Sequence, residues 1–307
     1  MSVAREVVLV GVPIDCVGIP EPGDPSFGTE LAPAALRGAG LADAIGAVDL
    51  GDLDVRLVGS ARDAEVGVLG WPTVRAMTGI LRTRIGAVMD DGRMPVVLGG
   101  DCTMLPGALA GARDALGDVG LAYLDGHLDL YDGRTSTTGE PADMPVAVLT
   151  GVGPPAWSEE VAAPLVSADR LALLGPRDRA EAAGLASALP EQVGLRRELS
   201  PPDLRARGMA AAGEETRARL AGADSAGRAQ GRYWVHLDVD VLDELVFPAT
   251  DYLMPGGLTL GELHDLMRPL VTGCGLAGLS LGCYNPDKDP DGSGARSLVG
   301  LFRELLT

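Results

Sequence analysis

The chain has 307 residues, of which 46% are hydrophobic but only 4% aromatic, so a large core must be filled mainly by alanine, valine and leucine. Its 43 acidic and 25 basic side chains give a formal net charge of −18, which repels nucleic acid and anionic membranes and favours cationic ligands. The four cysteines form no close pair, and no apolar stretch reaches the roughly 20 residues of a membrane-spanning helix. We therefore expect a cytoplasmic protein without nucleic-acid or membrane partners.

Strands and helices alternate along the predicted chain. Short apolar runs predict buried strands at 7–12, 45–50, 94–98, 171–174 and 276–281, with two more that begin at Leu121 and Arg232. Helices are predicted at 30–40, 71–89, 108–116, 201–229 and 260–270. The evidence is apolar residues spaced three and four apart, or residues such as proline and glycine that favour the start and the end of a helix. A loop is expected at 13–28 and a turn at 51–52. This alternation predicts one α/β domain with a mainly parallel sheet.

Four polar residues follow the strand that begins at Leu121: Asp125, His127, Asp129 and Asp132. If the strand continues through this segment, side chains two residues apart share one face, and the first three point the same way. Crowded carboxylates repel one another unless a cation lies among them, and oxygen and imidazole are ligands of divalent metals. Taken alone, the segment is compatible with a metal site or with a solvated acidic turn.

A second stretch of the same kind decides between these interpretations. The apolar run from Arg232 leads into Asp238 and Asp240, again two residues apart. Two such strands can supply both halves of one cage, and a shared carboxylate can bridge two ions about 3.5–4 Å apart. A metal centre is therefore the leading hypothesis.

A pair of glycines ends the predicted strand at 94–98. Gly99 and Gly100 allow the backbone to turn sharply, which brings Asp101 and Cys102 to the carboxyl edge of the sheet. This edge is also where the two acidic stretches end.

In this order, the motifs resemble those of the ureohydrolase superfamily, which includes arginase, agmatinase and formiminoglutamase. The residues that carry the resemblance are Gly99-Gly100-Asp101, the D-x-H-x-D of 125–129, the D-x-D of 238–240 and Gly256-Gly257-Leu258-Thr259. The resemblance covers nearly the whole chain. It implies a single arginase-like domain over residues 1–307, with a central sheet between two helical layers, and a homo-oligomer such as a trimer or hexamer.

The resemblance also implies a pair of Mn²⁺ ions. Their ligands would be Asp125 and Asp238 bridging both ions, His127 and Asp240 on one ion, and Asp129 and Cys102 on the other. The implied reaction is hydrolysis of a C–N bond in a linear amidine or guanidine, for which the ions lower the pKa of a water molecule. Asp129 would also hold the resulting hydroxide through a hydrogen bond and is therefore a candidate catalytic residue.

Cysteine replaces the family's usual histidine at position 102. Thiolate is softer than imidazole and shifts metal preference from manganese toward zinc or iron, or weakens that half of the site. A site with a single ion, in which Cys102 is only a small buried side chain, stays an open alternative.

The usual proton donor is also replaced. Arginase-like members place a histidine three residues before a proline, where this chain has Ala142 before Pro145. The nearby carboxylates are Glu140, our candidate general acid, and Asp143.

The expected substrate contacts differ as well, and the candidate substrate-binding residues are Tyr131, Thr138 and Cys283. Cys283 occupies the position of a glutamate that binds the guanidinium, so arginine would lose a pair worth about 1.5–3 kcal/mol. A small cationic or amidine substrate, such as hydroxyarginine, therefore fits better than arginine. A negative Glu140 beside Thr138 would disfavour a substrate carboxylate, which leaves an α-amino acid in question.

These losses motivate a second hypothesis from another functional class. The chain could be a catalytically silent member that keeps the fold and serves as a binding or assembly subunit. Metal content per chain and a screen for urea or ammonia release distinguish the two hypotheses.

Overall fold

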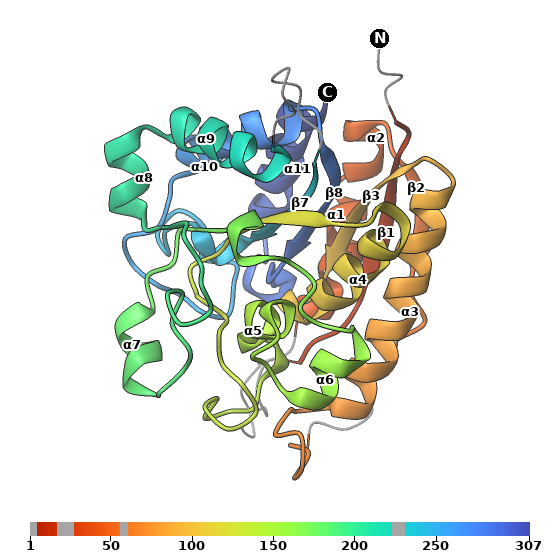
Figure 1. Ribbon diagram of the computed structural model, residues 1–307. Coiled ribbons are helices and arrows are strands. Elements are labelled where there is room, and N and C mark those ends of the chain that lie inside the picture. Colours follow the sequence, from red (N-terminus) through yellow and green to blue (C-terminus); the bar gives the residue numbers. More distant parts are fainter. Residues whose placement is uncertain (1–4, 17–27, 56–60, 223–230) are drawn as a thin grey trace.

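The computed structural model describes residues 5–16, 28–55, 61–222 and 231–307. Within these ranges eight strands form one sheet in the order β2-β1-β3-β8-β7-β4-β5-β6, and all neighbouring strands are parallel (Figure 1). The strands are β1 (Val7–Val12), β2 (Val48–Asp52), β3 (Met94–Gly99), β4 (Val119–Leu124), β5 (Leu171–Leu174), β6 (Glu198–Leu199), β7 (Arg232–Asp238) and β8 (Leu276–Gly282). The predicted α/β class with a parallel central sheet is confirmed.

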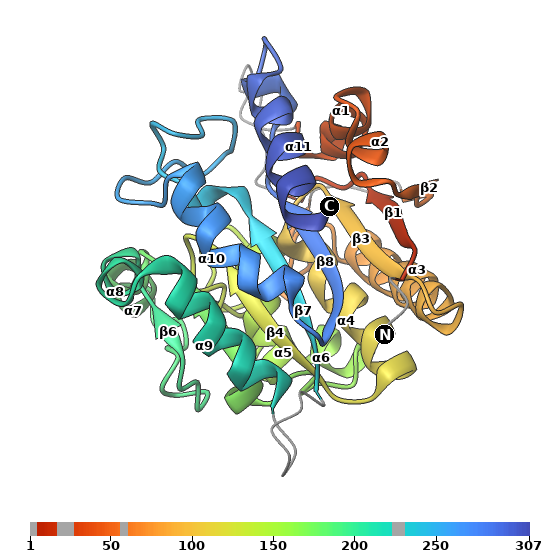
Figure 2. The same ribbon diagram turned by 90° about the horizontal axis from the view of Figure 1, so that it is seen from above.

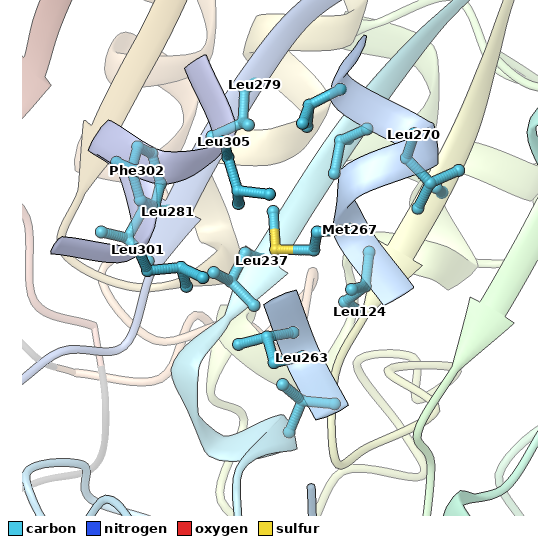
Figure 3. Close-up of a cluster of buried hydrophobic side chains, with 14 of the residues drawn as sticks. Leu124, Leu237, Leu263, Met267, Leu270, Leu279, Leu281, Leu301, Phe302 and Leu305 are labelled. Carbon is cyan, nitrogen blue, oxygen red and sulfur yellow. The ribbon is translucent and has the colours of Figure 1, made fainter. Parts of the chain in front are cut away.

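Helices cover both faces of the sheet, and in the view of Figure 2 one helical layer lies in front of the strands and the other behind them. One layer contains α1 (Ala32–Gly38), α2 (Leu41–Ile45), α9 (Met209–Ala221), α10 (Leu260–Thr272) and α11 (Ser293–Leu306). The opposite layer contains α3 (Trp71–Asp90), α4 (Leu105–Leu116), α5 (Pro145–Thr150) and α6 (Pro155–Glu160). In the first layer, Leu237 and Leu281 of the sheet pack with Met267 of α10 and Phe302 of α11 (Figure 3).

The central strands are apolar because both of their faces are covered. β3, β4 and β8 are buried along their whole length. In β7, Tyr233 and Val235 belong to the core of one layer and Trp234 to that of the other, as the alternation of a strand requires. The same alternation places His236 and Asp238 on the side of Trp234.

Several predicted boundaries are wrong. The helix expected at 30–40 begins as a 3₁₀ turn and ends at Gly38, and residues 51–52, expected to turn, belong to β2. The helical region expected at 201–229 is divided by Gly208, whose φ of +82° separates α8 (Pro201–Arg207) from α9. Residues 223–229 of that region, and 17–27 of the expected loop, lie outside the described residues.

Several short elements were not predicted from the sequence. α5, α6 and α7 (Arg179–Gly184) have six residues each and β6 has two, too few to establish a periodic pattern. In the part of the chain that the structure describes, none of the helices combines the length and the apolar character needed to cross a membrane.

Candidate metal centre

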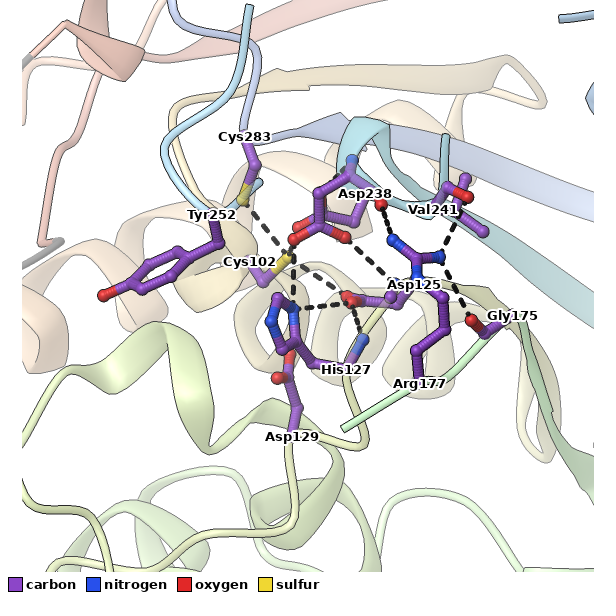
Figure 4. A network of polar contacts seen from close by, with 12 residues as sticks. Cys102, Asp125, His127, Asp129, Gly175, Arg177, Asp238, Val241, Tyr252 and Cys283 are labelled. Atoms are coloured by element: carbon purple, nitrogen blue, oxygen red, sulfur yellow. Dashed lines mark hydrogen bonds and ion pairs between the residues drawn. The ribbon is translucent and has the colours of Figure 1, made fainter. Parts of the chain in front are cut away.

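Four neighbouring strands each deliver a metal-ligating side chain at the same edge of the sheet. The order β3-β8-β7-β4 places Cys102, Cys283, Asp238 and Asp125 side by side at or just beyond the carboxyl ends of these strands. The carboxyl edge is where open parallel sheets bind their ligands. Figure 4 shows these side chains converging from separate parts of the chain.

The turn after β3 positions the first of these residues. A β-carbon on Gly100 would lie 1.5 Å from the carbonyl oxygen of Ile14, so only glycine fits there. The Asp101 carboxylate accepts hydrogen bonds from the backbone N–H groups of Thr103, at 2.9 Å, and Cys16, at 2.7 Å. Asp101 therefore braces the turn, and Cys102, the next residue, faces the cluster.

Carboxylates from the ends of β4 and β7 form the oxygen-rich part of the cluster. The backbone N–H of His127 donates to Asp125 at 2.6 Å, and that of Asp240 donates to Asp238 at 2.8 Å. The Nδ1 atom of His127 lies 3.0 Å from Asp240 Oδ2 and 3.4 Å from Asp125 Oδ1. The three aspartates offer oxygen atoms that all lie within 4.8 Å of one another.

Arg177 lies beside this cluster, and its hydrogen bonds go to backbone carbonyls, although its charge helps to lower the pKa of Asp240. Its guanidinium donates to the backbone carbonyl oxygens of Asp240, at 2.6 Å, and Val241, at 3.1 Å. It thus fixes the short turn after β7.

Asp129 reaches the cluster from a turn. The expectation of a strand through residue 129 is wrong, because β4 ends at Leu124 and Asp129 has a φ of +49°. The turn nevertheless brings its carboxylate within 4.8 Å of ligand atoms of Asp125 and His127. The hydroxyl of Tyr123, which we did not predict, donates to Asp129 Oδ2.

The electrostatics of the aspartates favour a bound cation. Burial, together with the charge of Asp240, raises the pKa of Asp125 to about 6. Burial and both neighbouring carboxylates raise the pKa of Asp238 well above its ordinary value. Burial is the largest effect on Asp240 too, but the charge and hydrogen bond of His127, the backbone N–H of Gly126 and the charge of Arg177 together outweigh it and leave the pKa of Asp240 lowered. Three buried carboxylates, two of them with raised pKa values, and one imidazole make a donor set that fits a divalent metal.

Sulfur and a second imidazole lie on the other side of Asp238. The Sγ atom of Cys102 lies 2.9 Å from Asp238 Oδ2, 3.7 Å from Cys283 Sγ and 3.2 Å from His236 Nε2. Burial lowers the pKa of His236 to about 3, so its ring is neutral at pH 7. The signal for His236 was its place two residues before Asp238, on the same face of β7.

Comparison with known proteins agrees with this fold and geometry. The sequence model of the arginase family matches residues 5–307. The chain belongs to the arginase family.

Arginases are among its most similar relatives. It is 28% identical to an arginase of Staphylococcus aureus (strain MRSA252), over 94% of this chain and 96% of the relative. It is also 28% identical to an arginase of Agrobacterium fabrum, over 97% of this chain and 90% of the relative. The crystal structure of Bacillus caldovelox arginase superposes with a TM-score of 0.84 at 26% identity, covering 98% of each chain. The chain is thus an arginase-family hydrolase of the ureohydrolase type. The family depends on paired manganese ions, acts on small molecules and commonly forms oligomers.

Five of the candidate metal ligands of this arginase-family protein line a cavity of about 320 Å³: Cys102, His127, Asp129, Asp238 and Asp240. The predicted substrate-binding residues Tyr131, Thr138 and Cys283 line it, as does Ala142. Six carboxylates line the cavity: Asp129, Asp143, Asp178, Glu181, Asp238 and Asp240. Among the residues that the structure describes, no lysine or arginine belongs to the lining. We did not predict Asp178 and Glu181, although acids three residues apart at a helix start face the same way.

Glu140, the predicted acid, is buried behind the cavity. The hydroxyl of Tyr252 donates to its carboxylate at 2.5 Å, and the Tyr252 ring meets His127 edge-on, with 5.8 Å between the ring centroids. Tyr252 lines the cavity, whereas Glu140 does not. Burial and the charge of Asp143 raise the pKa of Glu140 to about 7.

This raised pKa predicts a pH dependence of stability. The folded-state pKa of Glu140 exceeds the ordinary value of 4.5, so its contribution to stability is fully present below pH 4.5 and is lost as the pH rises through about 7. In Glu140→Gln, whose side-chain oxygen still accepts the Tyr252 hydrogen bond, Tm should fall less between pH 5 and pH 8 than in the wild type. Thermal denaturation at both pH values measures the difference. Exposed Glu65→Gln should behave like the wild type, and equal falls for all three proteins would refute the assignment.

Proposed function

We propose that this arginase-family protein hydrolyses a C–N bond in a small, cationic linear amidine or guanidine. The observation that carries the proposal is a cavity lined by carboxylates, with no lysine or arginine among its described residues, that ends on the cluster of candidate metal ligands. Such a cavity attracts a cationic substrate and repels an anionic one.

The residues that would hold the ions are Cys102, Asp125, His127, Asp129, Asp238 and Asp240. We propose Mn²⁺ for the oxygen-rich part of the cluster, because carboxylate oxygens suit that ion. Bound there, the metal would lower the pKa of a water molecule and make it nucleophilic.

Proton transfer falls to Asp129 in this proposal. Tyr123 donates to one carboxylate oxygen of Asp129, and the side chain lines the cavity, where the other oxygen can take a proton from water and pass it to the leaving amine. Glu140 reaches the cavity only through Tyr252, so we assign it the role of holding that ring in place.

The remaining contacts concern the substrate. Asp178 lines the cavity, where its carboxylate can pair with a substrate cation. At Ala142 and Cys283 the chain offers neither an imidazole to protonate the leaving group nor a carboxylate to pair with a guanidinium. Both absences favour a less basic guanidine, such as a hydroxyguanidine, whose leaving group needs less protonation.

The test combines metal analysis with a substrate screen. Purified protein loaded with Mn²⁺ is assayed for urea or ammonia release from arginine, hydroxyarginine, agmatine, guanidinobutyrate and formiminoglutamate. We expect bound metal and turnover, with hydroxyarginine hydrolysed faster than arginine. Bound metal without turnover of any compound would instead support the catalytically silent alternative.

Asp178→Asn tests the cationic end of the substrate site. A charge-assisted hydrogen bond is worth about 1.5–3 kcal/mol, so KM for a cationic substrate should rise about 10–100-fold while kcat changes little. Steady-state kinetics on the best compound of the screen measures both constants. Asp90→Asn, on the surface at the end of α3, is the control and should leave them unchanged. An unchanged KM in Asp178→Asn would remove Asp178 from the substrate site.

A further inference from the structure

We infer that Cys102 and Cys283, together with Asp238, form a thiolate half of the metal centre that selects a thiophilic ion such as Zn²⁺ over Mn²⁺. The inference rests on the proposed metal centre and adds Cys283 to it as a ligand. It replaces the substrate-binding role that we expected for Cys283 from the sequence.

The separation of the two sulfur atoms suits one shared ion. Their Sγ atoms lie 3.7 Å apart, and Cys102 Sγ lies 2.9 Å from Asp238 Oδ2. With a Zn–S bond of about 2.3 Å and tetrahedral angles, two thiolates on one zinc ion are about 3.8 Å apart. Both cysteines are free thiols, and the ligand atoms of all three residues lie within 4.8 Å of one another.

The backbone at Cys283 holds its side chain toward this site. Its φ of +64° is a left-handed conformation that side chains with a β-carbon rarely adopt. The backbone N–H of Cys283 donates to the carbonyl oxygen of Gly100 at 2.7 Å, which ties the end of β8 to the turn that carries Cys102. Such strain persists where the surrounding structure determines it, and it is concentrated at ligand sites.

His236 supports the thiolate from the opposite side. The indole N–H of Trp234 donates to Ser280 Oγ at 2.9 Å, and Ser280 Oγ lies 2.7 Å from His236 Nδ1. We assign the Ser280 hydroxyl proton to the hydrogen bond with Nδ1 of His236. Nε2 of His236 then carries the ring proton and donates a hydrogen bond to Cys102 Sγ, 3.2 Å away. A donor at the sulfur fixes the direction of its lone pairs, which makes His236 a positioning residue.

The two halves of the centre therefore differ in chemistry. Asp125, His127 and Asp240 offer two carboxylates and one imidazole, which suit Mn²⁺, whereas the second half offers two sulfurs. Asp238 lies between them, grouped with Asp125 and Asp240 on one side and with both cysteines on the other. An ion in each half would make a mixed-metal centre.

Cobalt reports the number of sulfur ligands directly. Metal-free full-length protein, kept reduced, is titrated with Co²⁺ while the thiolate-to-cobalt charge-transfer absorption in the near ultraviolet is recorded. We expect the intensity of two thiolates, about half of it in Cys102→Ser and in Cys283→Ser, and none in the double variant. Exposed Cys274→Ser is the matched control and should keep the full intensity.

Competition against bound Co²⁺ measures the metal preference. Zn²⁺ should displace the cobalt signal at a lower concentration than Mn²⁺, as at most sites, but the ratio of the two concentrations should be larger in the wild type than in Cys283→Ser. His236→Ala should keep both thiolate contributions while weakening zinc binding by roughly 10–100-fold, the usual effect of losing an outer partner. Circular dichroism of each metal-free variant shows whether it is folded.

Two results would overturn the inference: full charge-transfer intensity in folded Cys283→Ser, or a preference for Zn²⁺ over Mn²⁺ that is as large in Cys283→Ser as in the wild type. These outcomes are separable from failure of the proposed function. Hydrolysis without a two-sulfur signal supports the proposed function and contradicts the thiolate site. The full two-sulfur signal without hydrolysis of any compound supports the thiolate site and contradicts the proposed function.

Discussion

Asp238→Ala should abolish both metal binding and hydrolysis. Asp238 lies between the oxygen-rich and sulfur-rich halves of the cluster, so its loss removes a ligand from each. Without the metal, water is not activated, and we expect the hydrolysis rate to fall by more than about 10³-fold. Metal content per chain and urea or ammonia release under saturating substrate measure the two effects.

The same variant should stay folded without metal. Burial and two neighbouring carboxylates disfavour the ionised form of Asp238, so removing it relieves repulsion, and the metal-free variant should melt no lower than the metal-free wild type at pH 8. The control is Asp265→Ala, an exposed aspartate on α10, which should keep metal and activity. Full activity of Asp238→Ala would contradict the metal centre itself.

Trp234→Ala should lower the free energy of unfolding by about 3–5 kcal/mol. The indole is fully buried and fills space beside Gly278, where a β-carbon would lie 2.3 Å from its ring. It also donates a hydrogen bond to Ser280. Alanine leaves a cavity and removes that donor, in the middle of the strand that carries Asp238.

Urea denaturation of the metal-free proteins measures this loss without a contribution from metal binding. The control is Ile80→Ala on α3, because this isoleucine is 42% exposed and its truncation should change stability by no more than about 0.5 kcal/mol. A Trp234→Ala variant as stable as this control would show that the indole does not contribute to the core.

The oxygen-rich half of the site could be predicted from the sequence. Asp125 and His127, and likewise Asp238 and Asp240, are close in the chain and directly follow apolar runs, so local patterns alone place them at strand ends. The fold class followed from the same alternation of strands and helices. Asp129 was placed near these residues for a wrong reason, because the turn that positions it has no period of two.

The sequence by itself therefore determined the class of the fold, the acidic character of the site and the arginase family, because short local motifs predict all three. Only the tertiary structure decided that Cys283 and His236 lie against Cys102 and that Glu140 lies behind Tyr252. The reason is that β8 enters the sheet between β3 and β7, although it is the last strand along the chain. Sheet order depends on packing between distant segments, and no local pattern encodes which strand ends become neighbours.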